Sequence, residues 1–280
     1  MIKIICDTTS CLNLAKANEI GIGFIPQIIV IGEETYRDDT EMDPIAFLKR
    51  QKNSPVLPKT AAPPPAMYHP LYQKYLDEGA TIFVLTPSAE VSGTYRSATV
   101  AAQDFPGKDI RIIDTRLIAS GLASVVFQSL DWINSGMDAD TLEKKIKDYC
   151  LMCHTYFAID TLEYLYKGGR IGAASALIGS LLQMKPLLSF QNGHIEPLGN
   201  QRTHKRAIAR LIEMVVEQCP KDGSGRISIM HGDAFEEAKS IAVELAEKLG
   251  VQPADIPIFD LTPAILVHSG PGVIGVSFFA

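Results

Sequence analysis

The sequence contains no long hydrophobic run. No stretch approaches the roughly 20 apolar residues that a helix needs to cross a bilayer. The first residues also lack the pattern of a secretory signal, which is a basic segment followed by an apolar segment and a cleavage site. We therefore expect a cytoplasmic protein without a membrane-spanning segment.

Positive charge is scarce. The 280 residues include 26 Lys and Arg against 32 Asp and Glu, which gives a formal net charge of −6. Proteins that mainly bind nucleic acid usually carry an excess of positive charge, because contacts to phosphates dominate the affinity. The composition therefore argues against nucleic acid as the main partner.

Cysteine is scarce as well, and the five cysteines form no regular framework. An odd number without regular spacing predicts reduced thiols rather than disulfides. Cys150–His154 matches the C-x-x-C-H string of haem attachment, but covalent haem belongs to exported proteins and no export signal is seen. A zinc site would need a second pair of ligands that the neighbouring sequence does not offer, so we expect no metal.

One dinucleotide-binding motif is incomplete. Gly270–Gly275 satisfies G-x-G-x-x-G, but the helix that must follow has no room before the last residue, Ala280. No acidic residue follows about 20 positions later to bind a ribose hydroxyl. These glycines instead predict a close approach of the backbone beside His268 and Ser269, so we expect no bound cofactor.

The sequence lacks a hydrolase motif but contains the residue types of a hydrolase site. The sequence has no G-x-S-x-G nucleophile elbow. Ser92, His268 and either Asp7 or Asp114 nevertheless supply the side chains of a catalytic triad. Because nothing places a base beside Ser92, this alternative stays open.

The first half of the chain alternates short apolar runs with helical patterns. This alternation predicts an α/β fold with two lobes, in which the N-terminal lobe is a mostly parallel, Rossmann-like sheet covered by helices on both faces. We expect residues 1–150 to form this lobe and residues 151–280 to form a C-terminal α/β lobe with a mixed sheet. In the first lobe the strands are expected at residues 2–6, 24–31, 81–85 and 111–114, with helices at residues 118–132 and 141–149.

In the second half, Gln191–Gly193 is typical of a hairpin turn between two strands, at residues 185–190 and 194–198. Residues 173–182 have small side chains and almost no charge, which predicts a helix buried in protein or facing an apolar ligand. The remaining strands are expected at residues 155–160, 226–230, 256–261 and 275–279, and the remaining helices at residues 203–219 and 234–250.

The most informative segment is residues 82–98. It reads as a buried strand, a loop rich in hydroxyl groups and then a helix, and ligands of open α/β sheets bind at such places. Ser92 fits the N-cap of the helix. Its hydroxyl and the nearby N–H groups would suit a carboxylate or phosphate. A second interpretation, in which Ser92 caps the helix and binds no ligand, stays open. Polar residues also follow the strands that end near residues 7, 86 and 114, and we expect these loops to converge on one crevice.

Two further segments carry candidate binding residues. Residues 55–65 contain five prolines, which predicts a fixed, extended loop that holds Thr60 in one place. Lys167–Arg170 combines two glycines with two cations. This string is compatible with a phosphate site or with a simple helix C-cap whose charges face water, and both interpretations stay open.

Several of these strings together resemble the DegV family, in order and spacing and over essentially the whole chain. The strings are Asp7–Thr9, the Thr60 segment, Ser92–Tyr95, Leu162–Ile171, Lys185–Leu188 and His268–Gly272. The resemblance implies a two-lobed α/β protein that buries a long-chain fatty acid between its lobes. Some members of the family are the fatty-acid-binding subunit of bacterial fatty acid kinase and present the acyl carboxylate to a separate, dihydroxyacetone-kinase-like, ATP-dependent subunit.

The resemblance also implies roles for particular residues. The carboxylate would be held by Thr60 and by Ser92 with Gly93 in the Ser-Gly-Thr motif, with His268 nearby, and Arg170 would face the kinase partner. One departure stands out. Family members commonly show Thr-Ser-Gln-Pro at the loop, whereas this chain has Thr60–Pro63 as Thr-Ala-Ala-Pro, so a hydroxyl and an amide are missing beside Thr60.

The chemistry of such a carrier fits these residues. Burying a chain of about sixteen carbons at about 0.8 kcal/mol per methylene gives on the order of 10 kcal/mol before costs, so the tail alone can hold the ligand. The apolar residues 118–127 and 173–182 are candidate walls of the tunnel, although ordinary core packing would equally account for most of these side chains. We therefore expect a non-enzymatic lipid carrier with peripheral or transient membrane contact. The alternatives are a small-molecule hydrolase or phosphotransferase and a lipid-sensing module without a kinase.

Overall fold

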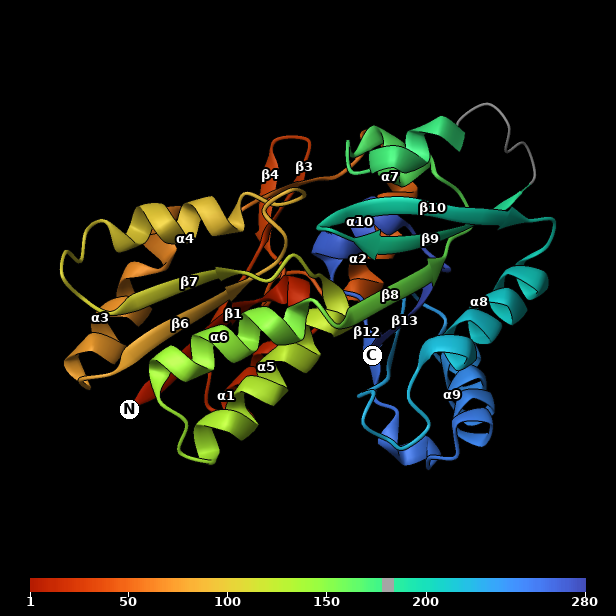
Figure 1. Cartoon of the computed structure of the whole chain (residues 1–280). Coiled ribbons are helices and arrows are strands. Elements are labelled where there is room, and N and C mark those ends of the chain that lie inside the picture. Colours follow the sequence, from red (N-terminus) through yellow and green to blue (C-terminus); the bar gives the residue numbers. More distant parts are fainter. Residues whose placement is uncertain (178–183) are drawn as a thin grey trace.

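A computed structural model describes residues 1–177 and 184–280. Its strands form two main sheets and one small sheet. In Figure 1 the parallel sheet lies to the left and the mixed sheet to the right, with the small sheet projecting upward between them. The fold is therefore an α/β architecture with a parallel four-stranded sheet and a separate mixed six-stranded sheet, as the sequence predicted.

The first sheet is parallel throughout, in the order β2-β1-β6-β7. Because side chains alternate along a strand, Ile4 and Ile5 of β1 point to opposite faces. Ile4 packs with α5 (Ala119–Asn134) and α6 (Ala139–Cys150), whereas Ile5 packs with α3 (His69–Asp77) and α4 (Thr94–Ala102), so helices cover both faces. The strands are β1 (Ile2–Asp7), β2 (Gly23–Ile25), β6 (Thr81–Thr86) and β7 (Ile110–Asp114).

The second sheet is mixed, in the order β10-β9-β8-β13-β11-β12, with only β11 and β12 parallel among its neighbouring pairs. Helices α8 (His204–Gln218) and α9 (Phe235–Leu249) cover one face with apolar side chains such as Leu211 and Leu245. The predicted hairpin is confirmed as β9 and β10. The strands are β8 (Cys153–Ala158), β9 (Lys185–Gln191), β10 (His194–Gln201), β11 (Ser228–His231), β12 (Ile258–Asp260) and β13 (Ile274–Phe279).

The strand expected at residues 24–31 is two strands in different sheets, which corrects that prediction. Pro26 has no N–H to donate, and the N–H of Gln27 bonds to the Asp38 carboxylate at 2.8 Å, so the ladder is interrupted between β2 and β3. The proline-rich loop likewise contains a short strand that carries Thr60. The small antiparallel sheet has the order β4-β3-β5 and consists of β3 (Ile28–Ile31), β4 (Glu34–Arg37) and β5 (Lys59–Ala61).

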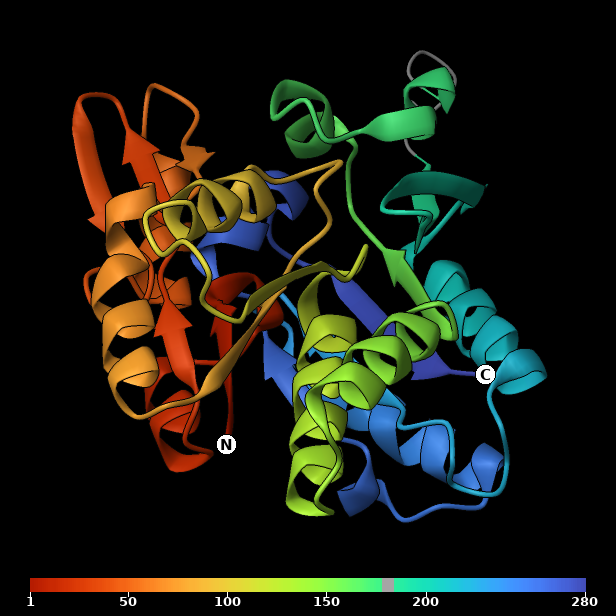
Figure 2. The ribbon, with the colours of Figure 1, turned by 60° about the vertical axis from the view of Figure 1, so that its left-hand side comes forward.

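Helix α5 joins the two halves of the molecule. It lies between the red and orange N-terminal segments and the blue C-terminal segments in Figure 2, and it contacts β1 and β6 as well as β8, β11 and β13. A division of the chain at residue 150 stays a prediction.

The other helical segments are η1 (Thr8–Ser10), α1 (Leu14–Glu19), α2 (Pro44–Asn53), η2 (Pro65–Met67), α3 (His69–Asp77), α4 (Thr94–Ala102), α5 (Ala119–Asn134), α6 (Ala139–Cys150), α7 (Glu163–Lys167), η3 (Gly172–Leu177), η4 (Pro253–Asp255) and α10 (Pro263–Ser269).

The helix expected at residues 173–182 is only partly described. Residues 172–177 form the 3-10 helix η3, and residues 178–182 lie outside the described residues. Ala174 is buried, but Ala173 and Ala176 are exposed, so the expected burial is wrong for this part. The segment contacts β10, where Gly172 lies so close to the Ile195 carbonyl that a Cβ would come within 2.5 Å of it.

Within residues 1–177 and 184–280, we find no helix with the length and apolar character needed to cross a membrane.

Candidate functional site

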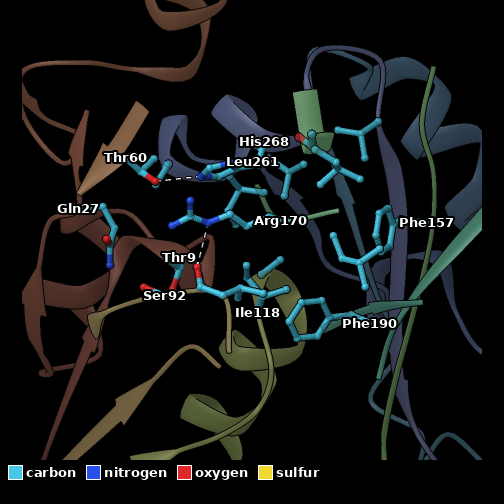
Figure 3. A pocket seen from close by; sticks show the side chains of 18 of the residues that line it. Thr9, Gln27, Thr60, Ser92, Ile118, Phe157, Arg170, Phe190, Leu261 and His268 are labelled. Carbon is cyan, nitrogen blue, oxygen red and sulfur yellow. Dashed lines mark hydrogen bonds between the residues drawn. The ribbon is translucent and has the colours of Figure 1, made fainter. Parts of the chain in front are cut away.

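A cavity of about 110 Å³ lies where α5, α10 and the strands of the mixed sheet meet the loops of the first half. We call it the central pocket. Figure 3 shows Thr60, Gln27 and Ser92 on one side of it and Phe157 and Phe190 on the other. Its lining residues are Thr9, Gln27, Thr60, Ala62, Val91, Ser92, Gly93, Ile118, Ala119, Thr155, Phe157, Leu165, Arg170, Phe190, Ile195, Met230, Leu261, Ala264, Ile265, His268, Ser269 and Val273.

Two of the sequence-predicted residues meet at the polar end of the pocket. Thr60 Oγ1 in β5 lies 2.9 Å from His268 Nε2 in α10, although the two residues are 208 positions apart (Figure 3). Burial, and after it the neighbouring Arg170, lowers the pKa of His268 to about 4. The imidazole is therefore neutral near pH 7 and takes part as a hydrogen-bonding group rather than as a cation.

Ser92 reaches the same end of the pocket. The N-cap position of α4 is Gly93, one residue after Ser92. Ser92 Oγ nevertheless accepts from the N–H of Thr94, the first residue of α4, at 3.3 Å and lies 2.9 Å from Thr94 Oγ1. Gly93 is also tightly placed, because a Cβ there would lie 3.3 Å from the Ala62 methyl group.

Arg170 lines the pocket beside His268 (Figure 3). Its Nε donates to the Val91 carbonyl at 3.1 Å and its Nη1 to the Gly168 carbonyl at 2.8 Å, so two backbone groups fix the guanidinium. Gly168 is needed for this arrangement, because a Cβ there would come within 2.3 Å of His268 Nδ1. A contact between Arg170 and a partner protein stays a prediction.

The Lys167–Arg170 string ends a helix. Lys167 is the last residue of α7, Gly168 is its C-cap and donates its N–H to the Tyr164 carbonyl, and Gly169 has a φ of +69°. Lys167 pairs with Glu163 one turn earlier and does not line the pocket described above. The C-cap interpretation of the two glycines is thus confirmed, and only Arg170 of the two cations reaches the pocket.

Sequence reasoning missed Gln27 and Thr94. Gln27 is 3% exposed and lines the pocket. Its Nε2 donates to Asp7 Oδ2 at 2.9 Å and to Thr94 Oγ1 at 2.8 Å, and Thr94 in turn contacts Ser92. A chain of hydrogen bonds therefore links the end of β1 to the Ser92 hydroxyl. Nothing in the local sequence of Gln27 signals this, because its partners are 20 and 67 positions away.

Two buried carboxyl groups lie behind the polar end. Burial raises the pKa of Asp7 to about 6, although hydrogen bonds from Thr9 and Gln27 oppose the rise. Burial also raises the pKa of Asp38 to about 7, while both its oxygens accept from Thr8 Oγ1 at 2.7 and 2.8 Å. These groups hold the loop after β1 against the segment that carries Gln27.

The expected convergence of the three loops is confirmed. The loop after β1 contributes Thr9 to the pocket, the loop after β6 contributes Ser92, and the segment after β7 contributes Ile118. Thr86 and Asp114 instead close their own loops: Thr86 Oγ1 donates to the Ile113 carbonyl at 3.1 Å, and Asp114 Oδ1 accepts from the N–H groups of Ala89 and Arg116 at 3.2 and 2.9 Å. Their polar atoms are used locally and do not line the pocket.

Apolar side chains form the other end of the pocket. Phe157, Phe190 and Met230 project from strands of the mixed sheet or its edge, and they are at most 9% exposed. Of the predicted wall at residues 118–127, Ile118 and Ala119 line the pocket, whereas Leu122 and its neighbours pack into the core of the parallel sheet. Residues 173–177 do not line it, and residues 178–182 lie outside the described residues.

Comparisons with known proteins agree over the full length. The DegV family model matches residues 1–280. The chain belongs to the DegV family. It is 34% identical over 281 residues to a DegV domain-containing protein of Streptomyces coelicolor, covering 98% of this chain and 97% of that protein. It is 30% identical over 248 residues to Protein DegV of Bacillus subtilis, covering 88% of each.

Solved structures of DegV proteins share the fold. A DegV family protein from Thermus thermophilus, described by its fatty acid binding, superposes with a TM-score of 0.89 at 27% identity and covers 100% of this chain and 99% of that one. DegV from Bacillus subtilis, described as a fatty acid binding protein, gives a TM-score of 0.86 at 28% identity with 100% and 99% coverage.

In this DegV chain the other motifs have structural roles. Gly270 has a φ of +73° and lies against Tyr164, whose ring a Cβ would approach to 2.4 Å, and the chain continues into β13 rather than a helix. His154 stacks on Phe278. Within the described ranges no group of three or more His, Cys, Asp or Glu could hold a metal, and no hydrogen bond joins Ser92 to His268.

Proposed function

We propose that this protein binds a long-chain fatty acid in the central pocket, with the carboxylate near Thr60, Ser92, Gly93 and His268. The single observation that carries the proposal is the distribution of polarity: hydroxyl, amide, imidazole and guanidinium groups gather at one end of a cavity whose remaining lining is mainly apolar. The fatty-acid-binding DegV proteins from Thermus thermophilus and Bacillus subtilis, with the same fold over the whole chain, support it.

The polar end suits light binding of a carboxylate. Thr60 and Ser92 can each donate a hydroxyl proton, whereas His268 is held neutral and Arg170 already donates to two backbone carbonyls. Among the described residues that line the pocket, Arg170 is the only guanidinium, and its Nε and Nη1 already donate to backbone carbonyls, so it does not present that fork to a carboxylate. One carboxylate oxygen therefore stays available for reaction.

The lining of the apolar end suits the acyl chain, and the pocket of about 110 Å³ would widen to enclose a long chain. Each buried methylene contributes about 0.8 kcal/mol, so a chain of about sixteen carbons supplies on the order of 10 kcal/mol before the costs of association. Ligand retention then depends mainly on the tail. The hydroxyl groups contribute less to affinity than the tail and determine which way the ligand lies.

We further propose that the carboxylate is presented to a separate, dihydroxyacetone-kinase-like subunit. A carboxylate oxygen attacks the γ-phosphorus of ATP, the bond to ADP breaks, and acyl phosphate forms in the partner's active site. In this proposal the chain itself is a cytoplasmic carrier rather than an enzyme. It takes no cofactor and does not bind nucleic acid. It loads its ligand through peripheral or transient contact with a membrane. We also propose that Arg170, which lines the polar end, faces the kinase subunit.

Mass spectrometry of the natively purified protein tests the binding step. A single acyl chain per protein supports the proposal, whereas an empty protein that hydrolyses esters or phosphates supports the hydrolase alternative. Incubation of the loaded protein with the kinase subunit and ATP tests the second step. Acyl phosphate is expected; a loaded protein that yields none would instead support a lipid-sensing module.

A further inference from the structure

Three hydroxyl side chains meet where α5 crosses the mixed sheet. Ser277 Oγ of β13 lies 2.9 Å from Thr155 Oγ1 of β8 and accepts from Ser120 Oγ of α5 at 3.1 Å. Thr155 is 3% exposed, and the two serines are 0% exposed. We call these three residues the hydroxyl cluster. The proposed function above assigns it no role.

The hydroxyl cluster borders the central pocket through Thr155, which is one of the lining residues. Thr155 and Phe157 are two positions apart in β8 and therefore share a face of the strand. Figure 3 shows Phe157 on the side of the pocket opposite Thr60 and Gln27. The hydroxyl cluster thus borders the pocket on the side of Phe157.

The wall behind Thr155 is closely packed. Gly121 follows Ser120 in α5, and a Cβ there would lie 3.0 Å from Cys153 Sγ and 3.4 Å from Thr155 Oγ1. The helix can approach the sheet this closely only because the residues between them are small. No free space therefore continues the pocket past Thr155 in this direction.

The hydroxyl cluster is also satisfied internally. Ser120 bonds to Ser277 and approaches Met230 Sδ at 3.7 Å, and Ser277 contacts Thr155. A methyl group can stop against these side chains without leaving a buried hydroxyl unpaired, and it would have to break their bonds to go further. Such a surface limits how deep an apolar chain can enter.

We infer that the hydroxyl cluster closes the acyl compartment and that Thr155 sets the longest fatty acid this protein holds. This inference rests on the proposed function. Each methylene that the pocket encloses raises affinity by about fourfold, which is the value of about 0.8 kcal/mol converted at 25 °C. Affinity should rise with chain length until the terminal methyl reaches Thr155, and carbons beyond that point should add nothing or weaken binding.

The test uses the full chain, stripped of lipid, and a series of straight saturated fatty acids from about twelve to about twenty carbons. Displacement of a fluorescent fatty acid gives the affinity for each length. Thr155→Ala removes a methyl group and a hydroxyl from the wall, so the preferred length should increase by about one carbon, with about a fourfold gain for that acid. Thr155→Leu adds bulk, so the preferred length should fall by about one or two carbons.

Two matched controls separate size from other effects. Thr155→Val keeps the volume and removes the hydroxyl, so the preferred length should not change. Ser228→Ala removes a buried hydroxyl that bonds to the Ser277 carbonyl at 3.5 Å and does not line the pocket described above, so the profile should again match that of the parent. Circular dichroism confirms that each variant is folded.

The experiment distinguishes failure of the inference about Thr155 from failure of the proposed fatty acid binding. If the parent binds fatty acids but Thr155→Ala gives the parent's length profile, the role of Thr155 is refuted and fatty acid binding stands. A shift in Thr155→Val as large as in Thr155→Ala would also refute it, because size would not be the cause. If the parent binds none of the acids, the proposed function itself is wrong.

Discussion

At its polar end the central pocket is assembled from segments far apart along the chain, whereas its apolar end is built from neighbouring strands and the first residues of one helix. Thr60 and His268 come from a short strand and a seven-residue helix 208 positions apart. Phe157 and Phe190 come from β8 and β9, which pair directly in the mixed sheet. The two ends therefore depend on different physical requirements.

The apolar end works through buried area, which tolerates small displacements because the hydrophobic effect has no direction. The polar end works through hydrogen bonds, which weaken steeply with distance and angle. Free energy of binding should therefore come mainly from the apolar end, and the orientation of the ligand from the polar end. Variants at each end should show this division.

The largest expected effect is on the apolar end. Ile118 is the N-cap of α5 and lines the pocket, but it makes no side-chain cap bond. Ile118→Asp introduces a favourable N-cap, so the fold should persist, while a carboxylate enters the space of the acyl chain. Fatty acid affinity should drop about a thousandfold, since an unpaired charge beside a buried chain costs about 4 kcal/mol or more.

Ile118→Asn is the matched control, because it supplies a comparable cap without the charge. It should bind clearly better than Ile118→Asp in the same displacement assay. Equal binding by the parent and Ile118→Asp, with both folded, would mean that the acyl chain does not pass Ile118.

At the polar end, replacing Thr60 and Ser92 together with Ala should weaken fatty acid binding by about a hundredfold, because two hydrogen bonds to a charged group are lost. The tail should still bind. Comparing a fatty acid with its methyl ester isolates the head group: the parent should prefer the acid, and the double variant should prefer neither. An unchanged preference for the acid would show that the carboxylate lies elsewhere.

The polar end should also make stability depend on pH. Burial raises the pKa of Asp38 from 3.8 to about 7, so the folded state holds this proton more tightly than the unfolded state. The contribution is complete below about pH 4 and is lost as pH rises through about 7. The free energy of unfolding should therefore fall between pH 5 and pH 8 by on the order of 2 kcal/mol from this group.

Asp38→Asn imitates the protonated carboxyl and should flatten that change in urea unfolding at the two pH values. Asp7, whose pKa is raised to about 6 by burial, should leave a smaller dependence of the same sign. Parallel curves for the parent and Asp38→Asn would contradict the assignment of the titration to Asp38.

The smallest expected effect concerns Gln27, which touches the pocket and orders its neighbours. Gln27→Leu removes the donor that bridges Asp7 and Thr94, so the Ser92 hydroxyl loses a fixed neighbour. Affinity for the fatty acid should fall about fivefold while affinity for the methyl ester stays unchanged. An equal fall for both ligands would indicate a general loss of packing instead.

The contrast between local segments and residues far apart in the sequence also explains which features the sequence predicted. Strands β1, β6 and β7 of the parallel sheet and the hairpin at Gln191–Gly193 follow from local periodicity and turn residues, which a single sequence displays. The meeting of Thr60 with His268 was expected only through the family resemblance. The bridge at Gln27 has no local signal, because it exists only after β1, β3 and α4 have come together.

The misplaced elements have equally local causes. The single strand expected at residues 24–31 fails because apolar character continues across Pro26, while the ladder does not. Ser92 was expected at the N-cap because serine is a favoured cap, but Gly93 takes that position. In both cases a single residue decides the outcome: Pro26 lacks an N–H, and Gly93 lacks a side chain. The apolar pattern of the surrounding segment does not reveal such an effect.

The most direct test of the division between the two ends is a crystal structure of the protein saturated with a single straight-chain fatty acid. We predict that the carboxylate lies within hydrogen-bond distance of both Thr60 and Ser92 and that the chain runs past Ile118 to Phe157. A carboxylate at the Phe157 end, or a fatty acid bound outside the central pocket, would contradict the account.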